Sequence, residues 1–160
     1  MSLTSAETFT TTDCRSVSVK RAVHADYEAV ATLLRDSELP IDGVIESLDQ
    51  FWVAEHQGRV VGVAGMERYG DSGLLRSVAV AGEWRGTGIG RTLVDRVLDE
   101  GRGAGVREVY LLTTTAEHYF PRLGFACVDQ ETVPAPLRAS AEFTGACPAS
   151  AVVMRRAATH

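Results

Sequence analysis

The sequence has few cysteines and histidines, and none of them stands in a pattern typical of a cross-link or a metal site. The three cysteines are an odd number, are widely spaced and never form a Cys-x-x-Cys pair, so a disulfide framework is not expected. The four histidines are scattered, without the helical spacing that zinc enzymes use. We therefore predict that the protein binds no metal.

Long apolar runs and an excess of basic residues are also missing. No apolar run reaches the ~20 residues that a membrane helix needs, and the N-terminus lacks the basic flank and apolar stretch of a signal peptide. The formal net charge is −5, which argues against a surface that binds the phosphates of a nucleic acid. The sequence predicts a cytoplasmic protein with no membrane or nucleic-acid partner.

The length and composition fit one globular domain. The chain has 160 residues, of which 45% are hydrophobic and 23% charged, and this is enough to bury a single core. Residues 1–16 hold a run of threonines with Phe9 as the only aromatic, which is too little apolar surface to repay ordering. We predict a flexible N-terminal tail over 1–16 and a single domain over 17–156.

Apolar periodicity divides the domain into strands and helices. Gln57-Gly58 between two β-rich segments indicates a two-residue hairpin, and the apolar face that starts at Ile89 indicates a helix. The segment 131–148, which holds three prolines, is expected to be a long loop. The order of elements predicts the α/β class, with a mixed sheet and helices on its faces. Strands are expected at 17–21, 51–56, 59–68, 74–80, 108–112, 125–128 and 150–155, and helical segments after Asp26, at 45–48, from Ile89 to Gly101-Arg102-Gly103, and at 116–123.

A glycine-rich loop, Arg85-Gly86-Thr87-Gly88-Ile89-Gly90, joins the strand that ends at Val80 to the following helix. Glycines at alternate positions leave backbone N–H groups bare, the helix N-terminus adds its positive dipole, and Arg91 adds charge. These features predict a pyrophosphate site, although a structural turn that needs positive φ would select glycine as well. The glycine spacing fits neither the dinucleotide fingerprint nor the nucleotide P-loop.

The strand Ser77-Val78-Ala79-Val80 followed by Arg-x-x-Gly-x-Gly resembles the acetyl-CoA motif of the GCN5-related N-acetyltransferases, the GNAT family. The resemblance implies a GNAT fold, whose mixed central sheet is splayed at the acetyl-CoA strand and has helices on both faces. It also implies that acetyl-CoA is the co-substrate. The end of the strand would then contact the pantetheine arm, and the loop would bind the pyrophosphate. The cofactor-binding residues that it implies are Val78, Ala79, Val80, Arg85, Gly86, Thr87, Gly88, Ile89, Gly90 and Arg91.

The segment from Ala116 to Phe125 resembles the family's next motif, a short helix closed by Gly-Phe. Many members place a tyrosine five residues before that phenylalanine, as proton donor to the leaving thiolate, and here the position is Phe120. A phenyl ring has no proton to give. The neighbouring Tyr119 points roughly 100° away on a helix, and it remains the candidate general acid beside water.

A subgroup associated with arsenic resistance shares three further stretches with this chain. They are Arg76 to Val80, Leu111 to Ala116, and Glu142-Phe143 with Cys147-Pro148. The resemblance implies arsenic resistance as one setting for the enzyme. Cys147 could act as a nucleophile or, with Cys127, as a soft arsenic ligand, but a cysteine is more commonly a small buried hydrophobe, and the sequence places no base beside either one.

Acetyl transfer needs a neutral amine, so a base is expected wherever the pKa of the amine lies well above 7. Glu67, near the end of a strand, is the candidate base, although a strand-end glutamate is commonly just solvated. Arg76 lies in an apolar strand, where a buried charge needs a partner. That partner is either Glu67 or an anionic group of the substrate. Glu142 is a second candidate substrate-binding residue.

These features together predict an acetyl-CoA-dependent N-acetyltransferase that acetylates a primary amine of a small molecule, with detoxification as one role. Two alternatives stay open. A peptide or protein N-acetyltransferase would share the cofactor site but needs an open groove, and Phe120 suggests a non-catalytic acyl-CoA sensor. A homodimer is suggested only by the resemblance to the family, and no residues in the sequence mark an interface.

Overall fold

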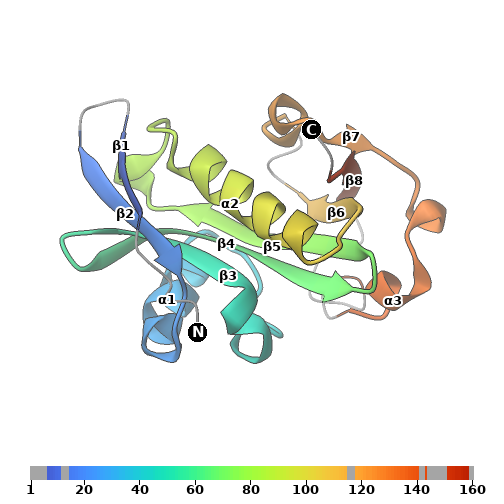
Figure 1. Ribbon diagram of the computed structural model, residues 1–160, viewed down its shortest axis with the longest axis horizontal. Helices are drawn as coiled ribbons and strands as arrows, with labels where there is room; N and C mark the ends of the chain where they lie inside the picture. Colours follow the sequence, from blue (N-terminus) through green and yellow to red (C-terminus); the bar gives the residue numbers. More distant parts are fainter. Residues whose placement is uncertain (1–6, 12–14, 115–117, 141–142, 144–150, 159–160) are drawn as a thin grey trace. The chain divides into compact units, whose positions relative to one another are not determined.

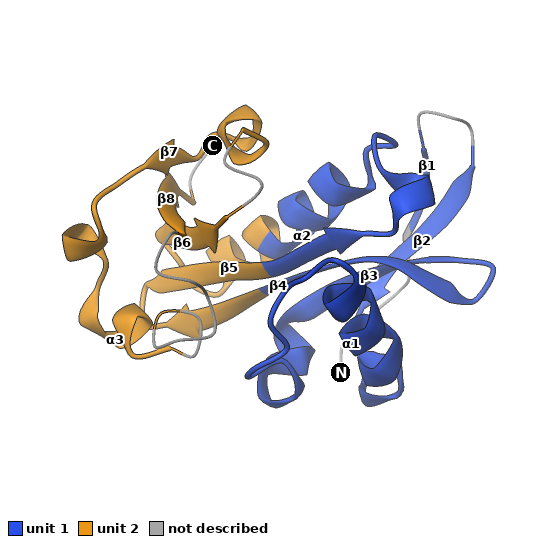
Figure 2. Ribbon diagram, turned by 180° about the vertical axis from the view of Figure 1, so that it is seen from behind, with its two compact units in different colours: residues 1–65, 77–97 blue, residues 66–76, 98–160 orange. Residues whose placement is uncertain are grey.

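The computed structural model describes residues 7–11, 15–114, 118–140, 143 and 151–158 (Figure 1). The chain divides into two compact units, shown in different colours in Figure 2. Unit 1 comprises residues 1–65 and 77–97, and unit 2 comprises residues 66–76 and 98–160. Strands β4 and β5 and helix α2 each contribute residues to both units.

Unit 1 is built on an antiparallel sheet in the order β1-β2-β3-β4. The turn between β3 and β4 has positive φ at both Gln57 (52°) and Gly58 (78°), as type I′ hairpins require, which confirms the predicted hairpin. The strands are β1 (Glu7–Thr10), β2 (Ser16–Arg21), β3 (Phe51–His56) and β4 (Arg59–Tyr69). The helical elements are η1 (His24–Asp26), α1 (Tyr27–Asp36), η2 (Ile45–Gln50), η3 (Gly82–Trp84) and α2 (Ile89–Gly103).

Helices cover both faces of the unit 1 sheet. Successive side chains along β4 point to opposite faces. Val63 packs in a core cluster with Val30 and Leu34 of α1. On the other face, a Cβ added to Gly62 would lie 2.8 Å from Cγ2 of Ile89 in α2, so this glycine lets α2 lie close against the strand. The expectation of helices on both faces is therefore confirmed in this unit.

The predicted tail over residues 1–16 is wrong for Glu7–Thr10, which forms strand β1. This strand pairs antiparallel with β2, in a register that sets Thr8 opposite Ser18. Composition misled the prediction, because the backbone hydrogen bonds of an edge strand come from its neighbour and need little apolar surface. The threonines also favour a strand, since β-branched residues have high β propensity.

Unit 2 is built around β5, β6, β8 and β7, which are hydrogen-bonded in that order. β5 and β6 are parallel, whereas β8 runs antiparallel to both of its neighbours, so the sheet is mixed as predicted. The unit 2 core holds Leu74, Tyr110, Val133, Leu137 and Val153. The elements are β5 (Ser72–Val80), β6 (Glu108–Thr113), η4 (Phe120–Leu123), β7 (Ala126–Cys127), η5 (Gln130–Thr132), α3 (Ala135–Arg138) and β8 (Val152–Ala157).

Two sequence predictions in unit 2 need correction. The helix expected over 116–123 is a single 3-10 turn, Phe120–Leu123, in the described residues, closed by Gly124 at a φ of 90°. The loop expected over 131–148 contains the helix Ala135–Arg138, in which Pro136 lies in the first turn, where a missing backbone N–H costs no intrahelical hydrogen bond. None of the described helices is long and apolar enough to cross a membrane.

Candidate cofactor site and catalytic residues

Strand β5 contains an unusual backbone conformation at Ser77, where the chain passes from unit 2 to unit 1. Ser77 is 7% exposed and has a φ of 60°, in the left-handed region that costs a residue with a Cβ about 1–2 kcal/mol. A left-handed residue within a strand is typical of a β-bulge, a feature common beside functional sites. The segment Val78–Val80, expected to meet the pantetheine arm, begins directly after this residue.

In the glycine-rich loop, Gly86 and Gly88 face outward, whereas the side chains of Thr87 and Ile89 are buried. Gly86 and Gly88 are exposed and have φ angles of 76° and 91°. Thr87 and Ile89, between and after them, are 6% and 0% exposed. The two buried side chains anchor the loop while the glycine backbone faces solvent. Gly90 has no positive φ and lies within α2, so no turn geometry accounts for it.

The start of α2 offers hydrogen-bond donors to an anion. The N–H of Thr92 donates to the carbonyl of Gly88 at 3.1 Å, which closes the first helical turn. The N–H groups of Ile89, Gly90 and Arg91 precede that bond and so lack intrahelical acceptors. The helix dipole and the exposed Arg91 add positive potential at the same end. The geometry fits the predicted pyrophosphate site.

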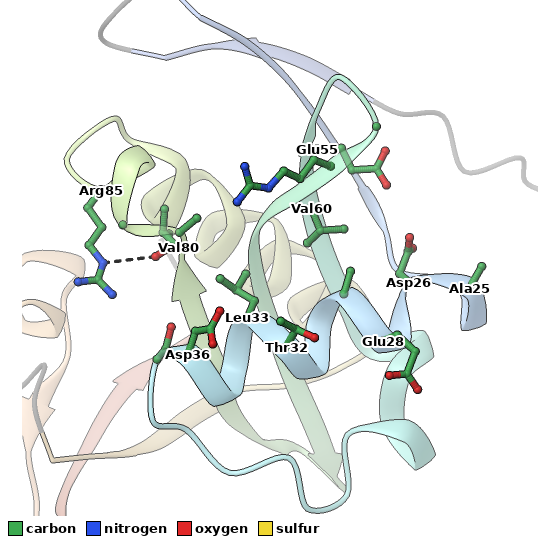
Figure 3. Close-up of a pocket in the computed structure, with 16 residues that line it drawn as sticks. Ala25, Asp26, Glu28, Thr32, Leu33, Asp36, Glu55, Val60, Val80 and Arg85 are labelled. Carbon is green, nitrogen blue, oxygen red and sulfur yellow. Dashed lines mark hydrogen bonds between the residues drawn. The ribbon is translucent and has the colours of Figure 1, made fainter.

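A cavity of about 850 Å³ adjoins this loop in unit 1 (Figure 3). Arg85 and Val80 both line it, and Arg85 donates from Nε to the carbonyl of Val80 at 3.3 Å. Four carboxylates but only two arginines line the cavity, so its charge does not suit a phosphate as the loop does. The charged lining residues are Asp26, Glu28, Asp36, Glu55, Arg59 and Arg85.

The candidate base Glu67 lies in unit 2, within a small buried network. Nη1 of Arg76 donates to Oε2 of Glu67 at 2.7 Å, and the two side chains are 0% and 9% exposed. The Tyr69 hydroxyl donates to Oε1 of the same carboxylate. The structure thus confirms that Arg76 has Glu67 as a partner, and both oxygens of the candidate base already accept a hydrogen bond. Binding of a substrate anion by Arg76 stays a prediction.

Sequence reasoning missed Tyr69, although its spacing of two from Glu67 puts both side chains on one face of β4. Burial, reinforced by the hydrogen bond to the Glu67 carboxylate, raises the pKa of Tyr69 from 10.0 to about 12. A raised pKa favours the neutral phenol in the folded state. The contribution of Tyr69 to stability is therefore complete below pH 10 and is lost as the pH rises toward 12.

We expect an ultraviolet titration of tyrosinate to show this late ionisation. The folded wild type should have an ionisation near pH 12 that a Tyr69→Phe variant lacks. Circular dichroism at each pH checks that the chain is still folded. A difference between the two proteins centred near pH 10 would show that Tyr69 is solvated and that the network is absent.

Tyr119 and Phe120 differ in their surroundings. The Phe120 ring is 6% exposed and packs edge-on against Phe125 at 5.9 Å between centroids. Tyr119 is half-buried and stands edge-on to Phe120 at 5.2 Å. Tyr119 is therefore the more accessible of the two, and its role as general acid stays a prediction.

The remaining predicted residues fall into two groups. Glu142 and Cys147 lie outside the described residues. Cys127 is exposed on β7, so it is not the small buried hydrophobe that the sequence allowed. Within the part of the chain that the structure describes, no group of three or more histidine, cysteine or acidic side chains is arranged to hold a metal.

Comparison with known proteins identifies the family. Residues 47–127, which include the glycine-rich loop, match the model of the acetyltransferase (GNAT) domain. An amino-acid acetyltransferase of Mycobacterium tuberculosis is 35% identical over 133 residues, which cover 77% of this chain and 75% of that protein. Curated amino-acid acetyltransferases of Pseudomonas aeruginosa and Neisseria meningitidis are longer, and the chain spans 21% and 29% of their lengths.

Solved structures show the same fold. N-acetylglutamate synthase of Neisseria gonorrhoeae, complexed with coenzyme A and N-acetyl-glutamate, superposes with a TM-score of 0.78 at 22% identity, over 90% of this chain and 35% of that one. A Mycobacterium tuberculosis protein in complex with CoA has a TM-score of 0.74 at 28% identity, over 87% and 98% of the two chains. None of these relatives is named for arsenic resistance. The chain belongs to the GNAT acetyltransferase family, whose acyl donor is acetyl-CoA.

Proposed function

We propose that this protein transfers the acetyl group of acetyl-CoA to the amine of a free amino acid. The observation that carries the proposal is the match, over three quarters of both chains, to a relative named as an amino-acid acetyltransferase. The exposed glycine backbone at the start of α2 supports it, because this arrangement suits a pyrophosphate. Detoxification and arsenic resistance would use the same reaction on another amine, and they stay predictions.

The loop and the end of β5 would hold the cofactor. The N–H groups of Ile89, Gly90 and Arg91 would donate to the pyrophosphate, with the Arg85 and Arg91 side chains adding charge. The backbone of Val78 to Val80 would meet the pantetheine arm. All of these residues belong to unit 1, which supports the proposal that they act on one ligand.

The amine must lose a proton before it can attack. A free amino acid carries a carboxylate beside its amine, and this charge raises the pKa of the amine above the value near 7.8 found at chain termini. A base is therefore useful, and we propose Glu67, with Arg76 holding its carboxylate in place. The neutral amine then bonds to the acetyl carbon and releases one further proton to solvent, and the carbon–sulfur bond breaks. The thiolate takes a proton from water or from Tyr119, which regains one from solvent.

Acetyl-CoA titration by calorimetry tests the cofactor site. Gly88→Ala should weaken binding about tenfold or more, because the new Cβ strains a φ of 91° and crowds the approach of the phosphates. Gly70→Ala is the matched control, since Gly70 also has positive φ, 64°, and open space around it, but lies in a turn of unit 2. Both variants should lose similar stability, and only Gly88→Ala should lose affinity.

The acceptor is tested by following thiol release with three panels of amines. We expect turnover with free amino acids and little with peptides or simple alkyl amines. Preference for peptides would favour the alternative of a peptide acetyltransferase, and binding of acetyl-CoA without turnover on any panel would favour the acyl-CoA sensor. If the wild type does not bind acetyl-CoA, the glycine-rich loop is a structural turn and not a cofactor site.

A further inference from the structure

Trp84 lies in η3, directly before the glycine-rich loop, and it is 3% exposed. The guanidinium carbon of Arg15 lies 3.5 Å from the centroid of its ring, well within the range of a cation–π contact. The ring of His56, at the end of β3, lies 4.8 Å away and is tilted by 54°. Side chains from two other parts of unit 1 therefore fix the position of this tryptophan.

Arg15 is itself held by Thr11, the residue that follows the strand β1, which the sequence did not predict. The N–H of Thr11 donates to the carbonyl of Arg15 at 2.8 Å, and the N–H of Arg15 donates back to Oγ1 of Thr11 at 3.0 Å. Thr11 is 3% exposed and follows directly after β1. Nη2 of Arg15 also donates to the carbonyl of Glu83 at 3.1 Å, so the same side chain touches both the ring and the backbone of η3.

The backbone of Trp84 is connected to the glycine-rich loop. Its carbonyl accepts a hydrogen bond from Oγ1 of Thr87, the buried threonine between the two left-handed glycines. Its N–H donates to the carbonyl of Ala81, which ties η3 to the end of β5. A continuous series of contacts thus runs from Thr11 through Arg15 and Trp84 to Thr87, all within unit 1.

We propose that Arg15 and Trp84 are positioning residues for the cofactor loop, which they hold in the conformation that receives the pyrophosphate. This inference rests on the proposed function. A loop with three glycines has a large backbone entropy to lose when it binds a ligand. Contacts that order the loop in advance lower that cost, and they act on affinity rather than on the chemical step.

The test compares two arginines that make the same kind of contact. Arg15→Ala removes the cation from Trp84, and Arg21→Ala is the control, because Arg21 lies over Trp52, 5.6 Å from its centroid. Arg15→Ala should raise the Kd and the KM for acetyl-CoA about fivefold to tenfold with kcat unchanged, whereas Arg21→Ala should change neither. Arg15→Lys keeps a cation over the ring and should restore part of the affinity.

Hydrogen–deuterium exchange gives a second readout that needs no cofactor. In the free protein, Arg15→Ala should speed the exchange of the amides at 85–91, and Arg21→Ala should not. Equal exchange and equal Kd in the two alanine variants would overturn the inference while leaving the proposed function intact. A wild type that does not bind acetyl-CoA would overturn the proposed function and this inference with it.

Discussion

Replacing Arg76 with methionine should lower the free energy of unfolding by about 3–5 kcal/mol. Methionine has a similar length, so the change removes the charge without opening a large cavity. It leaves the Glu67 carboxylate buried, with the hydrogen bond from the Tyr69 hydroxyl but without the charge of Arg76. A buried charge that loses its counter-charge is far more costly than a pair removed together. Urea unfolding of the variant and the wild type measures the loss.

A double variant separates the charge effect from packing. Arg76→Met with Glu67→Gln removes both charges and keeps an amide oxygen for Tyr69, so it should be more stable than Arg76→Met alone. The surface control is Arg102→Met, because Arg102 pairs with Asp99 on α2 with side chains 37% and 58% exposed. Arg102→Met should lower the free energy of unfolding by less than about 1 kcal/mol. Similar small losses for Arg76→Met and Arg102→Met would contradict a buried ion pair.

Gly65→Ala should destabilise the protein by about 3 kcal/mol, at the upper end of what overpacking a core usually costs. A Cβ at this position would lie 2.5 Å from Cζ of Phe51 and closer still to two other ring carbons. Phe51 is 0% exposed and pairs with Gly65 across β3 and β4, so the ring has nowhere to move. The Phe51 ring occupies the space that a side chain at Gly65 would need.

Phe51→Leu should relieve the clash, because the smaller side chain leaves room for the new methyl group. The double variant should therefore be more stable than the sum of the two single changes predicts, which thermal unfolding of the four proteins would show. Gly103→Ala is the control, because Gly103 ends α2 and has open space around it. This variant should be as stable as the wild type. A harmless Gly65→Ala would mean that β3 and β4 are not paired in this register.

Short-range patterns in the sequence were enough to predict the elements around the candidate site. Gln57-Gly58 suits a turn with two positive φ angles, and the alternate glycines of the loop separate a strand from an amphipathic helix. Arg76 could be predicted to need a partner, because an unpaired charge in an apolar strand is too costly to bury. In the structure Arg76 is paired with Glu67, one of the two partners that the sequence allowed.

Features that depend on distant residues were not predicted. β1 is a strand because β2 lies beside it, and no composition of residues 1–16 reveals that neighbour. The contact between Arg15 and Trp84 joins residues 69 positions apart, and neither has a local pattern that marks it. The positive φ of Ser77 is also invisible in the sequence, because serine in an apolar run reads as an ordinary strand residue.

Ser77 also limits how the sequence can diverge. Mutation toward a better strand would normally place valine or isoleucine at such a buried position. At a φ of 60° a β-branched side chain clashes with its own backbone, whereas glycine, asparagine and other small residues are tolerated. Selection for strand stability is therefore blocked at the residue where β5 passes between the two units. The left-handed conformation at Ser77 persists because the β-branched residues that favour a strand are the ones that this backbone cannot accept.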